Sequence, residues 1–111
     1  MEYMSVDEFR AAAAKSMPEK QFQEKHVVPA LRRHGFTHIF HVHDSRHSPA
    51  GFPDILAIRG HELHVVELKR EGKEATVEQQ SWLYAFRQVA GIVVHGVWRP
   101  SMIGRLDEVL R

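Results

Sequence analysis

The stretch GFPDILAIRGHELHVVELKREG, residues 51–72, holds two runs of β-favouring residues on either side of a Gly-His pair at positions 60 and 61. If this pair forms a tight type II′ hairpin turn, partners across the two strands have numbers that sum to 121. Asp54 then lies opposite Glu67, while apolar residues lie opposite apolar residues along the rest of that face. Opposed carboxylates repel unless positive charge lies between them, which a divalent cation would supply. Lys69 belongs to the same face, so the open end of the hairpin is predicted to carry two carboxylates and an ammonium group.

Capping signals and periodicity predict the remaining elements. Helices are expected over about 6–15, 19–34, 77–90 and 102–110, with Ser5, Ser16, Thr76 and Ser101 as N-caps, and further strands over 36–44 and 91–99. Gly35 is expected as a C-cap, and Pro29 is expected to remove a hydrogen bond and bend the second helix. The order helix, helix, three strands, helix, strand, helix predicts an α/β fold with a four-stranded mixed sheet flanked by helices.

Composition limits the class of protein. The chain has 111 residues, 43% of them hydrophobic, which fits one compact domain, and a formal net charge of +1, so charge alone does not indicate a strongly basic nucleic-acid clamp. It has no cysteine, so disulfides and thiolate metal sites are excluded. No apolar run reaches the roughly 18 residues of a membrane span, and no leader peptide is visible, so a cytoplasmic protein without membrane contact is expected. We expect residues 1–17 to form a helical extension and 18–111 a single domain.

Several motifs occur in order along the chain: GFPD at 51–54, ELK at 67–69 and TVEQQSWL at 76–83, followed by AG and VWRP. With these motifs the sequence resembles the PD-(D/E)XK nuclease superfamily and, within it, the small stand-alone VRR-NUC proteins of phages and bacteria. The resemblance covers nearly all of the chain from Pro18 onward, including the HDSRHSPAGFPD approach to the first motif. It implies a restriction-endonuclease-like αβββαβ core, with extra helices at both termini, and Mg²⁺- or Mn²⁺-dependent hydrolysis of phosphodiester bonds in DNA.

The resemblance also implies roles for individual residues. Asp54 and Glu67 would bind the metal together with the backbone carbonyl of Leu68, an all-oxygen set that suits a hard divalent ion. Lys69 would position or help to deprotonate the attacking water and would offset charge on the phosphorus.

Two further positions have a structural alternative. Gln79 matches the motif glutamine of the family and could orient water or phosphate, but Thr76 and Gln79 also have the spacing of a capping box. An acidic residue of the first core helix usually completes such sites. Glu19 matches the family's spacing to a following apolar residue and glutamine, whereas Glu24 matches the spacing seen in related junction resolvases. We prefer Glu19, although Ser16 and Glu19 could themselves form a capping box.

His43, Ser45 and Arg46 of the loop before the hairpin are expected to contact DNA, and so is Lys73 of the loop after the hairpin. His41 and His43 are expected near the site or simply packed, and Trp98 is expected in the core. The sequence HVHDSRH at 41–47 also suggests a zinc hydrolase, but that fold needs a much longer chain and further ligands.

A different function class is a catalytically inactive nucleic-acid-binding module of the same fold. The intact Asp54, Glu67 and Lys69 favour the nuclease. The resemblance is compatible with junctions such as Holliday junctions, with flaps and with nicked DNA as substrates, and a homodimer is expected from family analogy.

Overall fold

A computed structural model describes residues 3–42 and 48–111 of the chain. In chain order the elements are α1 (Val6–Ser16), α2 (Glu19–Phe22), the π-helix η1 (Gln23–Val27), α3 (Val28–Arg33), β1 (His38–His41), β2 (Ile55–Arg59), β3 (Glu62–Leu68), α4 (Val77–Arg87), β4 (Ile92–Trp98), the 3₁₀-helix η3 (Pro100–Arg105) and α5 (Leu106–Val109). The sheet order is β1-β2-β3-β4; β1/β2 and β2/β3 are antiparallel, and β3/β4 are parallel. The predicted α/β fold with a four-stranded mixed sheet is confirmed.

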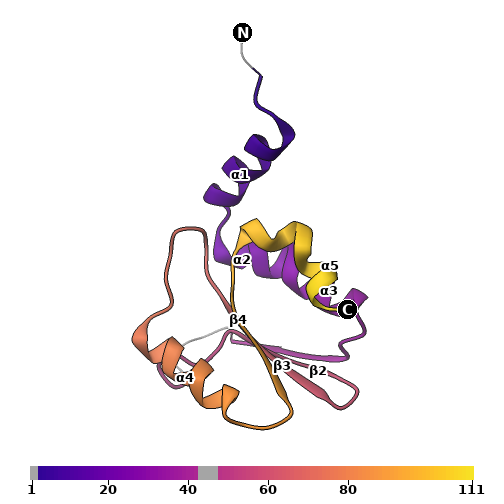
Figure 1. Cartoon of the computed structure of the whole chain (residues 1–111), viewed down its shortest axis with the longest axis vertical. Coiled ribbons are helices and arrows are strands. Elements are labelled where there is room, and N and C mark those ends of the chain that lie inside the picture. Colours follow the sequence, from indigo (N-terminus) through magenta and orange to yellow (C-terminus); the bar gives the residue numbers. More distant parts are fainter. Residues whose placement is uncertain (1–2, 43–47) are drawn as a thin grey trace.

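Helices cover the sheet from two sides. The helices α2, α3 and α5 lie together on one side of the strands and α4 lies on the other, while α1 projects away from the rest (Figure 1). The main core lies under the first group, where Phe22 and Leu31 meet strand residues such as Ile55 and Trp98, all of them buried. Trp98 is therefore a core residue, as predicted. Within residues 3–42 and 48–111, no helix is both long and apolar enough to cross a lipid bilayer.

The central hairpin has the predicted register. Leu56 pairs with Val65, and the residue numbers of every β2–β3 pair add up to the predicted 121. Gly60 has a φ of 57°, and no described non-glycine residue, His61 included, has a positive φ. A type I′ turn would need positive φ at both central residues, so these angles agree with the expected type II′ turn.

The second predicted helix is one helical stretch with a change of winding. Its middle, η1, is a π-helix that ends just before α3, and Pro29 lies in the first turn of α3. Proline lacks an N–H and its ring crowds the carbonyl four residues earlier, so a wider turn accommodates it. Gly35, with a φ of 85°, ends the helix as predicted. Phe36 N–H donates to the Leu31 carbonyl (3.1 Å), the bond of a Schellman cap.

Two of the predicted N-caps, Ser5 and Thr76, are confirmed. The predicted N-cap of the second helix, Ser16, is wrong. Ser5 caps α1, accepting from the Glu8 N–H at 3.0 Å, and Thr76 caps α4. Ser16 instead is the last residue of α1, and its hydroxyl donates to the Ala13 carbonyl at 3.1 Å. The N-cap of α2 is Pro18, without a side-chain hydrogen bond, because the extended segment after Ser16 places the helix start two residues farther on.

Two boundaries near the C-terminus also differ from the prediction. The last helical segment begins as a 3₁₀-helix at Pro100, so Ser101 lies inside it and does not cap it; its N–H donates to the Glu71 carboxylate at 2.7 Å. Proline at the first position starts the segment earlier than the serine signal suggested. The helix α4 ends at Arg87, short of Ala90, because Gly91 with a φ of 84° turns the chain into β4.

Candidate metal centre at the open end of the hairpin

The Asp54 carboxylate is held at the end of β3. It lies one residue before β2, and its Oδ2 accepts a hydrogen bond from the Leu68 N–H at 2.8 Å. The Asp54 backbone carbonyl accepts from the Val42 N–H, after β1, at 3.1 Å. Backbone groups of Val42 and Leu68 therefore fix the aspartate from both sides, and its carboxyl is close enough to Glu67 to raise the pKa of that residue, as the register predicted.

The Glu67 side chain is the least satisfied polar group of the described residues. It is 1% exposed, and when both acids are ionised neither of its carboxylate oxygens has a hydrogen-bond donor. Burial first, then a hydrogen bond with the Asp54 carboxyl that requires a proton between the two acids, and then the Asp54 charge raise the pKa of Glu67 to about 9; Lys69 opposes this shift and Glu19 adds to it. A buried carboxylate without a partner is costly, so this position favours a bound proton or a bound cation.

Glu19 at the start of α2 belongs to the same electrostatic group. Its pKa is raised by burial and by Asp54, and lowered by Lys69. The capping alternative for Glu19 is ruled out by the position of Ser16, which lies in α1. The structure thus brings the preferred acidic residue of the first core helix toward the Asp54–Glu67 pair.

Glu24 shows no such relation to the pair. Its side chain is 53% exposed and lies 4.0 Å from the Lys20 ammonium group, one turn earlier in the same helical stretch. An exposed ion pair of this kind is typical of a solvated helix face.

Lys69 completes the predicted charge arrangement. Its N–H donates to the Trp98 carbonyl at 3.0 Å, which fixes the backbone beside β4, and its ammonium group lowers the pKa of both Glu19 and Glu67. Among residues 3–42 and 48–111, no three His, Asp or Glu side chains form a group that could hold a metal by themselves. A metal ion at Asp54 and Glu67 would therefore take further oxygen ligands from water or backbone; Leu68 as such a ligand stays a prediction.

Gln79 forms the capping box that was its structural alternative. Its amide oxygen accepts from the Thr76 N–H at 2.8 Å, and the Thr76 hydroxyl accepts from the Gln79 N–H at 3.1 Å. The capping role is confirmed, and a catalytic role stays a prediction that involves only the amide nitrogen.

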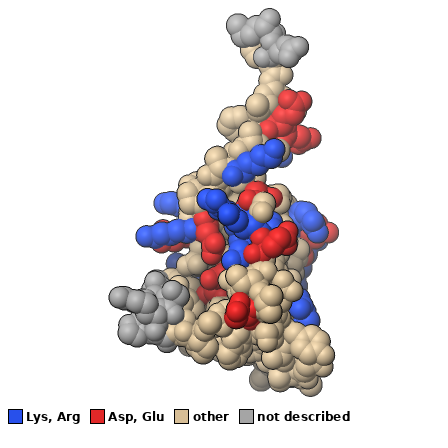
Figure 2. All heavy atoms as spheres, turned by 90° about the vertical axis from the view of Figure 1, so that its left-hand side faces the viewer, with Lys and Arg blue, Asp and Glu red and all other residues tan. Residues whose placement is uncertain are grey.

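The predicted nucleic-acid contacts are only partly visible. His43, Ser45 and Arg46 lie outside the described residues. Lys73 is exposed in the β3–α4 loop, where its carbonyl accepts two hydrogen bonds from the Arg99 guanidinium (2.8 and 3.3 Å). On the face shown in Figure 2, Lys and Arg side chains gather around Asp and Glu side chains across the middle of the molecule. His41 contacts Gln23 of η1 (Nδ1 to Nε2, 3.0 Å).

Sequence reasoning missed a pair of histidines, one buried and one partly buried, on the other side of the hairpin. His64, 4% exposed, has its Nδ1 2.7 Å from His95 Nε2 and its Nε2 2.9 Å from a Glu62 oxygen. The register of β4 against β3 skips His95, next to Gly96 with its φ of 82°. A glycine inside a predicted strand is the available signal for such a bulge.

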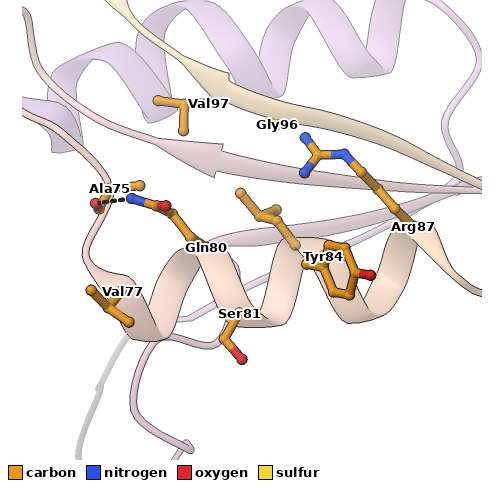
Figure 3. Close-up of a pocket in the computed structure, with 9 residues that line it drawn as sticks. Ala75, Val77, Gln80, Ser81, Tyr84, Arg87, Gly96 and Val97 are labelled. Carbon is orange, nitrogen blue, oxygen red and sulfur yellow. Dashed lines mark hydrogen bonds between the residues drawn. The ribbon is translucent and has the colours of Figure 1, made fainter.

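The hollow between α4 and β4 is not the candidate site. It has a volume of about 550 Å³ and lies between α4 and β4 (Figure 3). Its lining comprises Ala75, Val77, Gln80, Ser81, Leu83, Tyr84, Arg87, Gly96 and Val97. None of the clustered carboxylates contributes to it.

No protein-family model, no curated protein and no solved structure matches this chain.

Proposed function

We propose that this chain is a metal-dependent DNA nuclease of the PD-(D/E)XK type, hydrolysing phosphodiester bonds with Mg²⁺ or Mn²⁺. The observation that carries the proposal is the buried Glu67 carboxylate, whose two oxygens lack hydrogen-bond partners. It lies one residue before Leu68, whose N–H holds the Asp54 carboxylate in place. An oxygen-rich pair of this kind fits a hard divalent cation better than a transition metal that prefers nitrogen or sulfur.

Each residue of the centre has a distinct task in this proposal. Asp54 and Glu67 hold the metal ion, with Leu68 carbonyl oxygen and water as further ligands. A bound divalent ion supplies a water of lowered pKa and neutralises charge on the phosphate. Lys69 would position or help to deprotonate the attacking water, and Glu19 would add negative charge that attracts the cation, just as it favours a proton on Glu67 in the metal-free protein.

The competing explanation is that Glu67 is simply a protonated core residue, which its raised pKa also allows. A chain of that kind would be the inactive nucleic-acid-binding module. The two explanations differ in what a divalent cation does: a nuclease centre binds it through Asp54 and Glu67, whereas a protonated core residue does not.

The test is incubation of the purified protein with labelled linear, flapped and four-way-junction DNA in Mg²⁺, Mn²⁺ or EDTA. We expect cleavage with either metal and none in EDTA. Glu67→Gln should abolish cleavage. The matched control is Glu24→Gln, which removes an exposed carboxylate from the same helical stretch as Glu19 and should cut at the wild-type rate. Binding of DNA without cleavage under every metal condition would favour the inactive module. Light scattering of the same sample tests the proposed homodimer.

A further inference from the structure

The segment just before Asp54 is attached to α4 by side-chain contacts. The Ala50 carbonyl accepts a hydrogen bond from the Trp82 indole N–H at 3.1 Å. The Phe52 ring packs edge-to-face on Trp82, with ring centroids 5.1 Å apart, and contacts Phe86 at 6.2 Å. Two consecutive turns of α4 therefore hold both ends of the three-residue segment 50–52.

Between these contacts, Gly51 brings its backbone directly onto the first turn of α4. A Cβ at this position would lie 2.4 Å from the Glu78 carbonyl carbon and 2.6 Å from the Gln79 nitrogen, distances that real side chains do not reach. Its φ of 81° is also in the region that favours glycine. The capping box of Gln79 shapes the same turn, so the helix start and the glycine form one contact surface.

The attachment reaches Asp54 through a stiff link. Only Pro53 separates Phe52 from Asp54, and Pro53 is fully buried. Proline has a restricted φ, and burial restricts the remaining freedom, so displacement of Phe52 carries over to the aspartate.

We propose that Trp82 is a positioning residue of the metal centre: through Ala50 and Phe52 it fixes where the Asp54 carboxylate stands relative to Glu67. This inference rests on the proposed function for its metal consequences, but the placement of Asp54 can be measured without metal. Trp82 does not touch the reacting groups. Its role is to supply from α4 the third attachment of Asp54, beside those from Val42 and Leu68. Binding and catalytic groups need placement within about 0.5 Å, which makes an additional attachment consequential.

The test uses the Leu68 amide proton as a reporter, because it donates directly to Asp54 Oδ2. We compare wild type, Trp82→Phe, Trp82→Ala and the control Tyr84→Ala, in which the residue lost is 66% exposed on the same helix. In metal-free protein, Trp82→Ala should move the Leu68 amide resonance and speed its hydrogen exchange by about tenfold or more. Trp82→Phe keeps the ring and loses the indole N–H, so it should give a smaller change of the same sign. Tyr84→Ala should leave the resonance in place.

Calorimetric titration with Mn²⁺ gives the second readout. The affinity should fall by about tenfold in Trp82→Ala and stay at the wild-type value in Tyr84→Ala, in line with losses from disturbed supporting residues. If Trp82→Ala does not fold, Trp82→Phe still decides the question through the Leu68 resonance. An unchanged Leu68 amide in the folded Trp82 variants would overturn the inference, because strand contacts alone would then place Asp54. If wild type binds no Mn²⁺, the proposed function fails, whereas a shifted Leu68 amide still supports the positioning role.

Discussion

Asp54 Oδ2 accepts a 2.8 Å hydrogen bond from the N–H of Leu68, the residue directly after Glu67, whose own carboxylate has no hydrogen-bond partner. One acid of the pair is thus stabilised by the fold and the other is destabilised by it. The two positions should therefore respond in opposite ways to loss of charge when no metal is bound.

Glu67→Gln should stabilise the metal-free protein, increasingly so as the pH rises. The pKa of Glu67 is raised from 4.5 to about 9, so the folded state holds a proton that the unfolded state releases between these values. This contribution is fully present below pH 4.5 and is lost as pH rises toward 9. Wild type should lose on the order of 4 kcal/mol between pH 5 and pH 8 from this group, and the variant should not. Urea unfolding at pH 5, 6.5 and 8 measures the difference; parallel pH profiles for both proteins would contradict the assignment.

Asp54→Ala should instead destabilise the metal-free protein by about 1–3 kcal/mol, because the Leu68 N–H loses its acceptor. Asp54→Asn keeps an acceptor oxygen and should cost less. The measurement is the same urea unfolding, in EDTA. Equal stability of wild type and Asp54→Ala would show that water or another group replaces the carboxylate without loss.

Mn²⁺ should raise the melting temperature of wild type and of Glu24→Gln, but not that of Glu67→Gln or Asp54→Asn. A ligand at 100 times its dissociation constant stabilises the folded state by about 2.7 kcal/mol. Thermal scans over a Mn²⁺ series, with Ca²⁺ and EDTA as references, provide the check. Equal Mn²⁺ stabilisation in Glu67→Gln would move the metal away from this pair.

Lys69→Ala should separate metal binding from chemistry. We expect nearly unchanged Mn²⁺ affinity and a loss of cleavage rate of about 10²–10⁴-fold, the usual contribution of a proton-transferring or charge-stabilising group. Single-turnover cleavage at saturating protein measures the rate on bound DNA. Weaker DNA binding with an unchanged single-turnover rate would make Lys69 a phosphate contact only.

The histidine pair should contribute the opposite pH dependence on the acid side. Burial, then His64 and Arg59, lower the pKa of His95 from 6.5 to about 4, so below pH 6.5 the unfolded state binds the proton more readily. Stability should therefore fall by roughly 2–3 kcal/mol as pH decreases from 6.5 toward 4. Because Glu67 acts in the other direction over this range, the experiment is best done with Glu67→Gln alone and with Glu67→Gln/His95→Gln. Persistence of the decrease in the double variant would assign it to other groups.

The hairpin and the carboxylate pair could be predicted because both follow from neighbouring residues. Gly60 suits one turn type, and the residues on both sides of the turn alternate strictly, so only one register is possible. That register alone places Asp54 beside Glu67. The helix end at Gly35 and the Thr76 cap are local in the same sense. Ser16 and Ser101 show the limit of local signals, since prolines two residues after or one residue before them set the helix starts.

What only the tertiary structure decided was the environment of that pair. The sequence by itself determined that two acids and a lysine meet at one sheet end, and it offered Glu19 and Glu24 of one helix as the third acid, with a preference for Glu19. Packing of α2 over the sheet turned Glu19 toward Asp54 and left Glu24 in solvent. Segments distant in the chain likewise bury Glu67, which raises its pKa, and they bring the backbone of Gly51 into contact with α4. Hydrogen-bonded turns and alternation are encoded within a few residues, whereas burial depends on which surfaces meet when all elements pack together.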